Sequence, residues 1–452
     1  MSVVKSSFKA RVFANNSAAS LFNFQWIPSH ARELAPLTLM LVTLLCCAAG
    51  VQAQTSVVTQ HNDIGRTGQN RNETILTPAN VNSTGFGKLF SYAIDGRAYA
   101  QPLYVPGVTM GAGTVQAGTK HNVVFIATEH DSVYAFDADN NGGSNANPLW
   151  KITLLDSAHG AASGATTVPN GDVSTGDIVP EVGITGTPVI DISTNTIYVV
   201  GKTKEGGNYF QRLHALDITT GAEKSGSPVT LAAQVSGNGT GSSGGVLKWD
   251  SKWENNRAGL LLLNGIVYVG FAAHGDNGPW HGWILAYNAA SLQQTSAFCA
   301  TSNGSGSGIW MSGAGLAADT VNNGRIFVTT GNGAFNANNP PYTNSMSYGD
   351  DFVRLDITNG VMNAGDHFTP LNQSSLNGSD ADVSSGGVLL LPDQSAGGHT
   401  HLMIEAGKEG RIYLVDRDNL GGYNSSSDNI VQEVPVNNSS QSNQTFKING
   451  LW

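Results

Sequence analysis

The stretch VVFIATEHDSVYAFD at residues 123–137 consists of two short runs of β-branched and aromatic residues with polar residues between them. Val, Ile, Tyr and Phe favour β-strands, and a polar interval of this length is typical of a tight reversal. The stretch therefore predicts a β-hairpin. Similar stretches occur at 196–217, 266–288, 325–356 and 401–416, of which 325–356 contains an insertion.

The hairpins form a regular repeat. Their second strands end in Asp or Asn at positions 137, 217, 288, 356 and 416, so the period is 60 to 80 residues. A further short apolar run precedes each hairpin from the second onward, at 184–191, 258–265, 312–319 and 386–393. Small antiparallel sheets repeated at this spacing indicate a β-propeller, whose blades usually have four strands. We predict an all-β propeller with at least five blades visible here and six to eight when whole.

The N-terminal region has the features of a secretory signal. Basic residues precede an apolar run at 37–49, and Val51-Gln-Ala53 supplies small residues where a signal peptidase reads them. We predict cleavage after Ala53 and export to the periplasm or the extracellular space, with no membrane span in the mature chain. An uncleaved membrane anchor is the alternative. The predicted organisation is a signal peptide (1–53), an N-terminal polar segment (54–84) and a propeller domain (85–452) that could be incomplete at its C-terminus.

The charge and cysteine content exclude some classes of function. Without residues 1–53 the chain keeps 19 basic and 32 acidic side chains, so the mature protein is acidic. An acidic surface without a basic cluster disfavours nucleic acid as a partner. Cys46 and Cys47 lie in the predicted signal peptide and leave Cys299 alone, so the exported chain cannot rely on internal disulfides.

The repeat resembles that of the pyrroloquinoline-quinone (PQQ) propellers, the quinoprotein alcohol dehydrogenase-like superfamily. Its pattern V-Y-V-x-T-x-D-G-x-V-Y-A-x-D-A-x-T-G-x-x-x-W is represented at 123–150, 213–224 and 353–360, and the resemblance spans roughly 85 to 452. The phrases TQHNDIGRTGQN, YAQPLYVPGV and GKEGRIYLVDRDN are most similar to exported bacterial members of unknown role. The resemblance implies the fold but not the activity, because the same repeat serves dehydrogenases, an assembly scaffold and other exported proteins.

The chain departs from the dehydrogenases of this superfamily. Similarity to them would imply a disulfide between adjacent cysteines over the cofactor, a Trp floor, calcium ligands and a catalytic Asp. The only adjacent cysteines, Cys46 and Cys47, are in the predicted signal peptide. The Trp of the repeat is present as Trp150, but Ser225 replaces it in the second unit. No residue can therefore be assigned as catalytic by resemblance.

One segment partly matches a calcium loop. Asp137, Asp139 and Asn141, followed by Gly, fit the opening D-x-[DN]-x-[DN]-G, whose side-chain oxygens converge on the cation. The bidentate Glu that closes such a loop is missing, because Pro148 occupies its position. The alternative is that Asp137 accepts backbone amides in the next turn. We expect this turn-forming role for the repeated aspartates Asp137, Asp217, Asp356 and Asp416.

Polar residues recur where the hairpins are expected to reverse. Equivalent turns of a propeller lie on one face around the central channel, where a ligand could contact several blades. The alternative is that these side chains are polar because turns are solvated. The candidate ligand-binding rim comprises Glu129, His130, Asp131, Lys202, Lys204, Glu205, His274, Asp276, Asn277, Asn332, Lys408 and Glu409.

Large aromatic residues lie beside glycines in the third and fourth units. Trp280, Trp283 and Trp310 could pack between blades, or could offer a stacking platform for a sugar or quinone ring. Both interpretations suit a propeller.

These features favour a non-enzymatic, exported propeller that binds a small molecule, a glycan or a protein on its rim. The alternative is a PQQ-dependent oxidoreductase of alcohols or sugars, which would require PQQ and calcium as cofactors. A glycan-acting hydrolase would need paired carboxylates on the rim. We predict no cofactor for the favoured function.

Overall fold

The computed structural model describes residues 55–142, 147–311 and 313–435. The predicted signal peptide lies outside these ranges. The chain forms two compact units, and the larger contains Ser56–Arg71 and the residues from Lys88 onward. Apart from Thr55, the described part of the smaller unit is Asn72–Gly87. Local turns organise that segment, in which Asn80 Oδ1 accepts the Thr77 amide at 2.8 Å.

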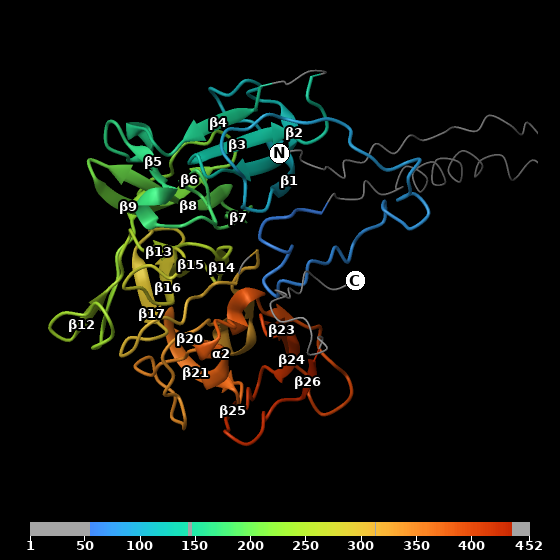
Figure 1. Cartoon of the computed structure of the whole chain (residues 1–452). Coiled ribbons are helices and arrows are strands. Elements are labelled where there is room, and N and C mark those ends of the chain that lie inside the picture. The colour runs from blue at the N-terminus through green and yellow to red at the C-terminus, as the bar shows by residue number, and fades with distance from the viewer. Residues whose placement is uncertain (1–54, 143–146, 312, 436–452) are drawn as a thin grey trace, which may run out of the picture. The chain divides into compact units, whose positions relative to one another are not determined.

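Five antiparallel sheets follow one another in the described part of the larger unit (Figure 1). In each of them, four strands pair in chain order. The strands are β1 (Leu103–Thr109), β2 (Lys120–Ala127), β3 (Ser132–Asp137) and β4 (Trp150–Thr153) in the first sheet; β7 (Val189–Asp191), β8 (Thr196–Glu205), β9 (Asn208–Asp217) and β10 (Val229–Thr230) in the second; β14 (Leu261–Leu263), β15 (Ile266–Ala273), β16 (Trp283–Asn288) and β17 (Gln294–Cys299) in the third; β18 (Ala317–Asp319), β19 (Arg325–Thr329), β20 (Phe352–Thr358) and β21 (Val361–Thr369) in the fourth; and β22 (Leu389–Leu390), β23 (Leu402–Ala406), β24 (Arg411–Asp416) and β26 (Gln432–Pro435) in the fifth.

Shorter elements extend these sheets or connect them. They are the strands β5 (Thr166–Pro169), β6 (Glu181–Val182), β11 (Gln234–Ser236), β12 (Val246–Lys248), β13 (Glu254–Asn255) and β25 (Gly422–Tyr423), the helix α2 (Gln373–Gly378), and the 3-10 turns η2 (Ser157–His159), η3 (Asn170–Val173), η4 (Val321–Asn323) and η5 (Val383–Ser385).

The second sheet buries both of its faces against neighbouring sheets. In β8, Ile197 and Val199 pack in one apolar cluster with residues of the first sheet, including Phe125. The intervening Tyr198 and Val200 pack in a second cluster with residues of the third sheet. Side chains alternate between the two faces of a strand, so β8 is apolar throughout its buried part. Successive sheets that pack face to face are the blades of a β-propeller, and this fold prediction is confirmed.

The N-terminal segment Val57–Arg66, which we call the hub segment, contacts the first strands of these sheets or the residues just before them. Val57 exchanges two backbone hydrogen bonds of 2.8 Å with Tyr104 of β1. Amides of β7, β18 and β22 donate to backbone carbonyls of the hub segment. The pairs are Ile190 to Val58 (2.8 Å), Ala318 to Ile64 (2.7 Å) and Leu390 to Gly65 (2.8 Å). The side chain of Arg66 reaches Leu260, next to β14.

The hub segment lies within the polar segment that the sequence predicts at 54–84. That prediction rests on the low strand character of these residues. The backbone of Ser56–Arg71 belongs to the same compact unit as the sheets. The backbone polar groups of this segment are hydrogen-bonded by strands that lie far away in the sequence. No local sequence pattern therefore indicates these contacts.

Arg66 is the central side chain of the hub segment and is only 1% exposed. Its Nε donates to the Leu316 carbonyl at 2.8 Å, and Nη2 donates to the Leu260 carbonyl at 3.2 Å. Nη1 donates to Thr59 Oγ1 at 2.6 Å and to the Gln60 carbonyl at 2.8 Å. Burial lowers the pKa of the guanidinium to about 10, so it stays charged at neutral pH. One side chain thus joins the third sheet, the fourth sheet and the hub segment.

Two glycines allow this close approach. A Cβ at Gly315 would lie 2.9 Å from Arg66 Cζ, and a Cβ at Gly259 would lie 3.0 Å from Gln60 Cβ. The two glycines pair with each other in a parallel bridge between neighbouring sheets. This explains why the apolar runs of the third and fourth units both contain Ala-Gly-Leu, at 258–260 and 314–316, since a larger residue in place of Gly would displace the hub segment.

The repeated residues at the strand ends mostly form turns. Asp217 Oδ1 accepts the Thr219 amide, and Asp137 Oδ1 and Asp416 Oδ1 likewise accept amides two residues ahead, each at 2.8 Å. The expectation was wrong for Asp356, which instead accepts the Arg354 guanidinium at 3.0 Å. The sequence does not separate these roles, because both place an Asp at the end of a strand.

We predict that Arg66→Ala destabilises the protein by at least about 3 kcal/mol, because three buried carbonyls lose their donor and each such loss costs about 1–3 kcal/mol. Chemical denaturation followed by tryptophan fluorescence measures this. The control is Arg71→Ala, which removes an exposed arginine close to the hub segment. Equal stabilities of the two variants would contradict the role of Arg66.

Candidate functional site

Buried charged groups gather where the second and third strands of the sheets turn, which we call the hairpin face. Glu129 lies in the turn between β2 and β3 and is 1% exposed. Its Oε2 accepts the Gly183 amide at 2.8 Å and Thr185 Oγ1 at 3.1 Å. Its Oε1 is buried and has no hydrogen-bond partner among the described residues. Burial raises the pKa of Glu129 to about 7.

Lys202 and His274 form a buried pair between the second and third sheets. Lys202 Nζ donates to the carbonyls of Lys252 and Glu254 at 2.8 and 3.1 Å, and lies 2.7 Å from His274 Nε2. Burial lowers the pKa of Lys202 to about 7; burial, helped by Lys202 and then by Arg257, lowers that of His274 to about 2. When Nε2 accepts from the lysine, the proton of the neutral imidazole is on Nδ1.

His274 therefore presents an N–H group to its surroundings. Nδ1 is buried without a hydrogen-bond partner in the described part of the chain. The same holds for Asp131 Oδ2 in the neighbouring turn, whose other oxygen accepts the Lys202 amide at 3.3 Å. Burial, followed by the charge of Glu129, raises the pKa of Asp131.

Arg257 precedes β14 and is half-buried. Its guanidinium lies over the ring of Trp310, with 5.9 Å between Cζ and the ring centroid. Trp280 meets Trp310 edge to face, with ring centroids 5.7 Å apart. Gly308 lies against both rings, since a Cβ there would be 3.0 Å from Trp280 Cζ3 and 2.9 Å from Trp310 Nε1. Partial burial lowers the pKa of Arg257, with Asp177, Tyr99 and Glu129 opposing this effect.

Acidic side chains of the fourth and fifth sheets complete this face. Asp382 accepts the Asn332 amide at 2.9 Å and pairs with Lys408 at 2.5 Å. Asp350 is fully buried, and burial, with a further contribution from Asp382, raises its pKa to about 8. The side chain of Asp276 is exposed but partly desolvated by its neighbours. This desolvation, followed by the charges of Asp382 and Asp380, raises the pKa of Asp276.

The remaining rim candidates are engaged with nearby partners. His130 Nδ1 lies 2.9 Å from Glu181, and Lys204 pairs with Asp172 at 2.5 Å. Glu205 forms a buried ion pair with Arg212 at the end of the second hairpin. Two further contacts are those of Asn277 with the His274 carbonyl at 2.8 Å and of Glu409 with the hydroxyl of Tyr413. Lys202, Lys204 and Glu205 lie on β8 rather than in a turn, because that hairpin is longer than expected.

Sequence reasoning missed Arg257, Glu254, Asp350 and Asp382. Glu254 and Arg257 belong to WENNRAG, which leads into the first strand of the third sheet, and Asp350 lies at the end of a long insertion. The repeat pattern points only to hairpin turns, whereas these residues reach the same face from other connections. Charged residues directly before an apolar run are the signal that could have found them.

The predicted calcium residues form a turn of their own. Asp137 Oδ1 accepts the amides of Asp139 and Asn140 at 2.8 and 3.1 Å, while Oδ2 lies 2.8 Å from His121 Nδ1. Asp139 Oδ2 accepts a hydrogen bond from Asn122 Nδ2 at 2.8 Å. Asn141 lies two residues further along the chain. The described residues contain no group of three or more His, Cys, Asp or Glu that could hold a metal ion. The geometry supports the turn-forming role of Asp137.

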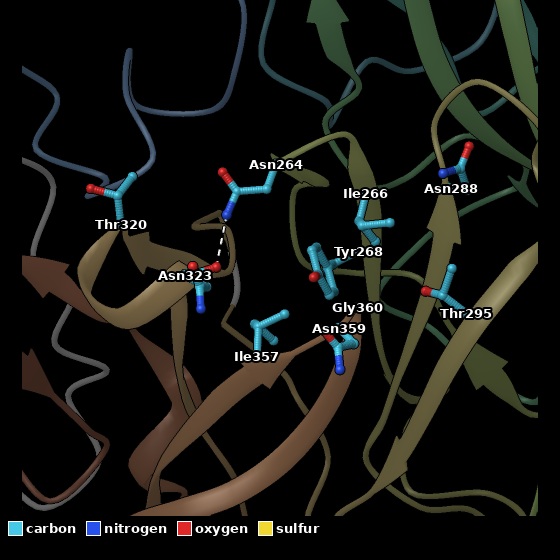
Figure 2. A pocket seen from close by; sticks show the side chains of 10 residues that line it. All are labelled: Asn264, Ile266, Tyr268, Asn288, Thr295, Thr320, Asn323, Ile357, Asn359 and Gly360. Atoms are coloured by element: carbon cyan, nitrogen blue, oxygen red, sulfur yellow. Dashed lines mark hydrogen bonds between the residues drawn. The ribbon is translucent and has the colours of Figure 1, made fainter.

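A groove of about 750 Å³ lies at the opposite ends of the third and fourth hairpins (Figure 2). Its lining is neutral and consists of Asn264, Ile266, Tyr268, Asn288, Thr295, Thr320, Asn323, Ile357, Asn359 and Gly360. Asn264 Nδ2 closes one side by donating to the Asn323 carbonyl at 2.8 Å. Asn264, Asn323 and Asn359 have positive φ, so the turns themselves account for these asparagines.

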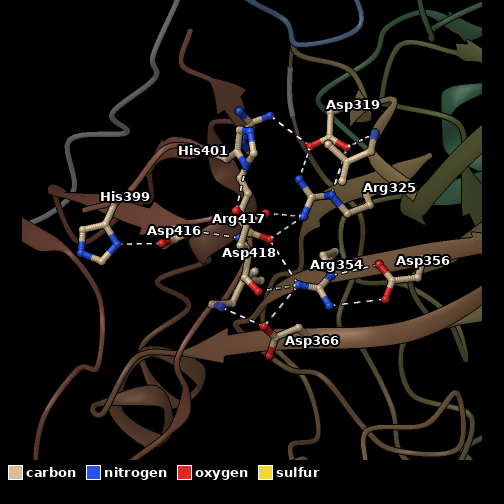
Figure 3. Close-up of polar contacts among 12 residues, drawn as sticks. Asp319, Arg325, Arg354, Asp356, Asp366, His399, His401, Asp416, Arg417 and Asp418 are labelled. Atoms are coloured by element: carbon tan, nitrogen blue, oxygen red, sulfur yellow. Dashed lines mark hydrogen bonds and ion pairs between the residues drawn. The ribbon is translucent and has the colours of Figure 1, made fainter. Parts of the chain in front are cut away.

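A network of ion pairs joins the fourth and fifth sheets (Figure 3). Arg325 pairs with Asp319 and Asp418, both at 2.6 Å, and Arg417 reaches the same Asp319 at 3.1 Å. His401 adds a contact of 2.7 Å to Asp418. These charges satisfy one another, which indicates a structural role.

Comparison with known proteins finds distant similarity to solved structures only. No family profile matches the chain, and no curated protein matches it. Solved structures that are similar in fold include a quinohemoprotein alcohol dehydrogenase from Comamonas testosteroni (16% identity, 84% of this chain, 50% of that chain, TM-score 0.49), the quinohemoprotein alcohol dehydrogenase ADHIIG from Pseudomonas putida HK5 (13%, 84%, 48%, 0.47) and a europium-containing methanol dehydrogenase (13%, 84%, 58%, 0.44).

The chain spans only about half the length of these solved chains. At such low identity and TM-score, nothing about activity follows from the likeness. No helix in the described residues is long and apolar enough to cross a bilayer.

The raised pKa of Glu129 gives a pH-dependent prediction. Folded Glu129 holds its proton up to about pH 7, whereas an unfolded glutamate ionises above about pH 4.5, so its contribution to stability is lost as pH rises through this window. Glu129→Gln does not ionise. We expect the free energy of unfolding of the variant, relative to the native chain, to rise by about 2–3 kcal/mol between pH 5 and pH 8.

Urea denaturation at both pH values measures this difference. The comparison variant is Glu433→Gln, which removes a carboxylate that is exposed on β26 and pairs with Arg411. A difference for Glu129→Gln that does not change with pH would contradict the protonated state of Glu129.

Proposed function

We propose that this chain is a ligand-binding propeller that holds a small polar ligand on its hairpin face. The observation that carries the proposal is a set of buried polar atoms from several sheets that lack hydrogen-bond partners in the described ranges: Glu129 Oε1, Asp131 Oδ2, His274 Nδ1 and Asp350 Oδ2. An unpaired buried polar atom costs about 1–3 kcal/mol, so such atoms persist mainly where a ligand or water completes them. Perturbed pKa values on the same face support a functional site.

The surroundings of these atoms favour binding. Lys202 Nζ donates to two carbonyls and contacts His274 Nε2. These contacts hold the His274 imidazole in a fixed position. Trp280 and Trp310 supply a large apolar surface beside the charges. Polar groups of fixed position next to an aromatic surface are the usual composition of a small-molecule site.

A PQQ-dependent oxidoreductase is the second candidate. The arrangement of Arg257 over Trp310 suits a planar ring that carries carboxylates, as PQQ does. The chemistry also needs a cation that polarises the quinone, and the described residues offer no ligand set for one. Cys299 is buried on β17 and burial raises its pKa, so it supplies no reactive thiol. The residues fit a carboxylated ring but not the metal, and we derive no oxidation from them.

Native mass spectrometry of the secreted protein, followed by thermal-shift titration, tests the proposal. We expect a bound small molecule, or a ligand from a panel of sugars, sugar acids, organic acids and PQQ with calcium, to raise the melting temperature. Trp310→Ala should abolish the shift, whereas Asn359→Ala in the neutral groove should preserve it. A chain without a bound molecule and without a shift for any compound would contradict the proposal. Dye reduction with alcohols or aldoses that chelation abolishes would favour the oxidoreductase.

A further inference from the structure

We infer that Arg257 is the anion-binding group of the hairpin face and that the ligand is a hydroxylated carboxylic acid whose ring lies against Trp310, the chemistry of a uronic acid. This inference rests on the proposed function and specifies its ligand class. It starts from an arginine that differs from the other arginines of the chain.

Arg257 is half-buried, yet none of the described residues forms a hydrogen bond or an ion pair with it. The other arginines with comparable or greater burial have partners. Arg66 donates to backbone carbonyls, and the remaining ones pair with carboxylates: Arg212 with Glu205, Arg325 with Asp319, Arg354 with Asp356, Arg411 with Glu433 and Arg417 with Asp319. A guanidinium that has lost water without gaining a partner is costly, and its planar array of donors matches a carboxylate.

Trp310 fixes the orientation of this guanidinium. The cation lies over the indole ring, and Trp280 supports the ring from its edge. Stacking on tryptophan restricts the rotamers of an arginine, which prepares its free N–H groups for a ligand. The same two indoles provide an apolar surface on which a sugar ring can lie.

Two buried groups beside Arg257 define what else the ligand carries. His274 and Glu129 are each 1% exposed, and each has one polar atom without a protein partner among the described residues. Both groups interact electrostatically with Arg257. His274 Nδ1–H can donate to a second carboxylate oxygen of the ligand. Glu129 Oε1 carries the proton of the neutral acid, because Oε2 accepts two hydrogen bonds, and can donate it to a hydroxyl oxygen of the ligand. A ligand with both a carboxylate and hydroxyls satisfies all three side chains.

The charge of the whole chain sharpens this selectivity. The net charge is −10, so the protein repels anions in general, and an anionic ligand binds only where local cations outweigh that field. Preference for an acid over its neutral analogue therefore reports on Arg257 rather than on a diffuse basic surface.

Isothermal titration of the mature protein with glucuronate and galacturonate, and with glucose and galactose as neutral analogues, tests the inference. We expect the acids to bind at least about tenfold more tightly than the neutral sugars, the loss expected when a charge-assisted pair is removed. Arg257→Gln should abolish this preference and Arg257→Lys should retain part of it. The control Arg71→Gln, which alters an exposed arginine, should leave the preference unchanged. Melting temperatures verify that each variant is folded.

The outcomes separate the two proposals. Equal binding of acids and neutral sugars, or a preference that survives in Arg257→Gln, overturns the inference but leaves a ligand-binding propeller. Binding of benzoate or inorganic sulfate as tight as that of glucuronate overturns the assignment of a hydroxylated ring. Binding of another compound of the panel, with no response to uronates, overturns the inference alone. No binding of any compound overturns both proposals.

Discussion

The hydrogen bonds between the hub segment and the first strands of the five sheets are the constraint on which the rest of this structure depends. Each sheet is a short meander that contacts mainly its neighbours, as in other repeat architectures. The hub segment adds a connection that all five share, and Arg66 anchors it between the third and fourth sheets. A fully buried guanidinium bonded to carbonyls tolerates little displacement, so it fixes the separation of those strands.

The same constraint positions the hairpin face. Gly259, shortly before β14, packs against Gln60 of the hub segment. Arg257 lies two residues before this glycine. Glu254 pairs in the short strand β13 with the end of β15, where His274 follows. The third sheet therefore carries the hub contact and the ligand-binding candidates on one continuous stretch. Displacement of the hub segment should therefore shift the residues of the hairpin face, although the hub segment contributes no side chain to that face.

The sequence predicted the repeated features of the fold and missed what occurs once. Hairpins such as 123–137 can be predicted because short runs of β-branched and aromatic residues indicate a strand wherever they recur. The hub segment lacks that signal, since its partners are strands such as β18 and β22 more than 200 residues away. Rim residues at the hairpin turns, such as Glu129 and His274, could be proposed from their place in the repeat, whereas Arg257 could not. Burial decides whether a polar residue is paired, and spacing alone does not report burial.

Hydrogen exchange of the backbone amides of Ile190, Ala318 and Leu390 tests the central role of the hub segment most directly. These amides donate to hub carbonyls from three different sheets. They should exchange as slowly as amides in the middle of β15, and Arg66→Ala should accelerate all three together, because they depend on one shared segment. Fast exchange of these amides in the native chain, or acceleration of one without the others, would contradict a hub that ties the sheets together.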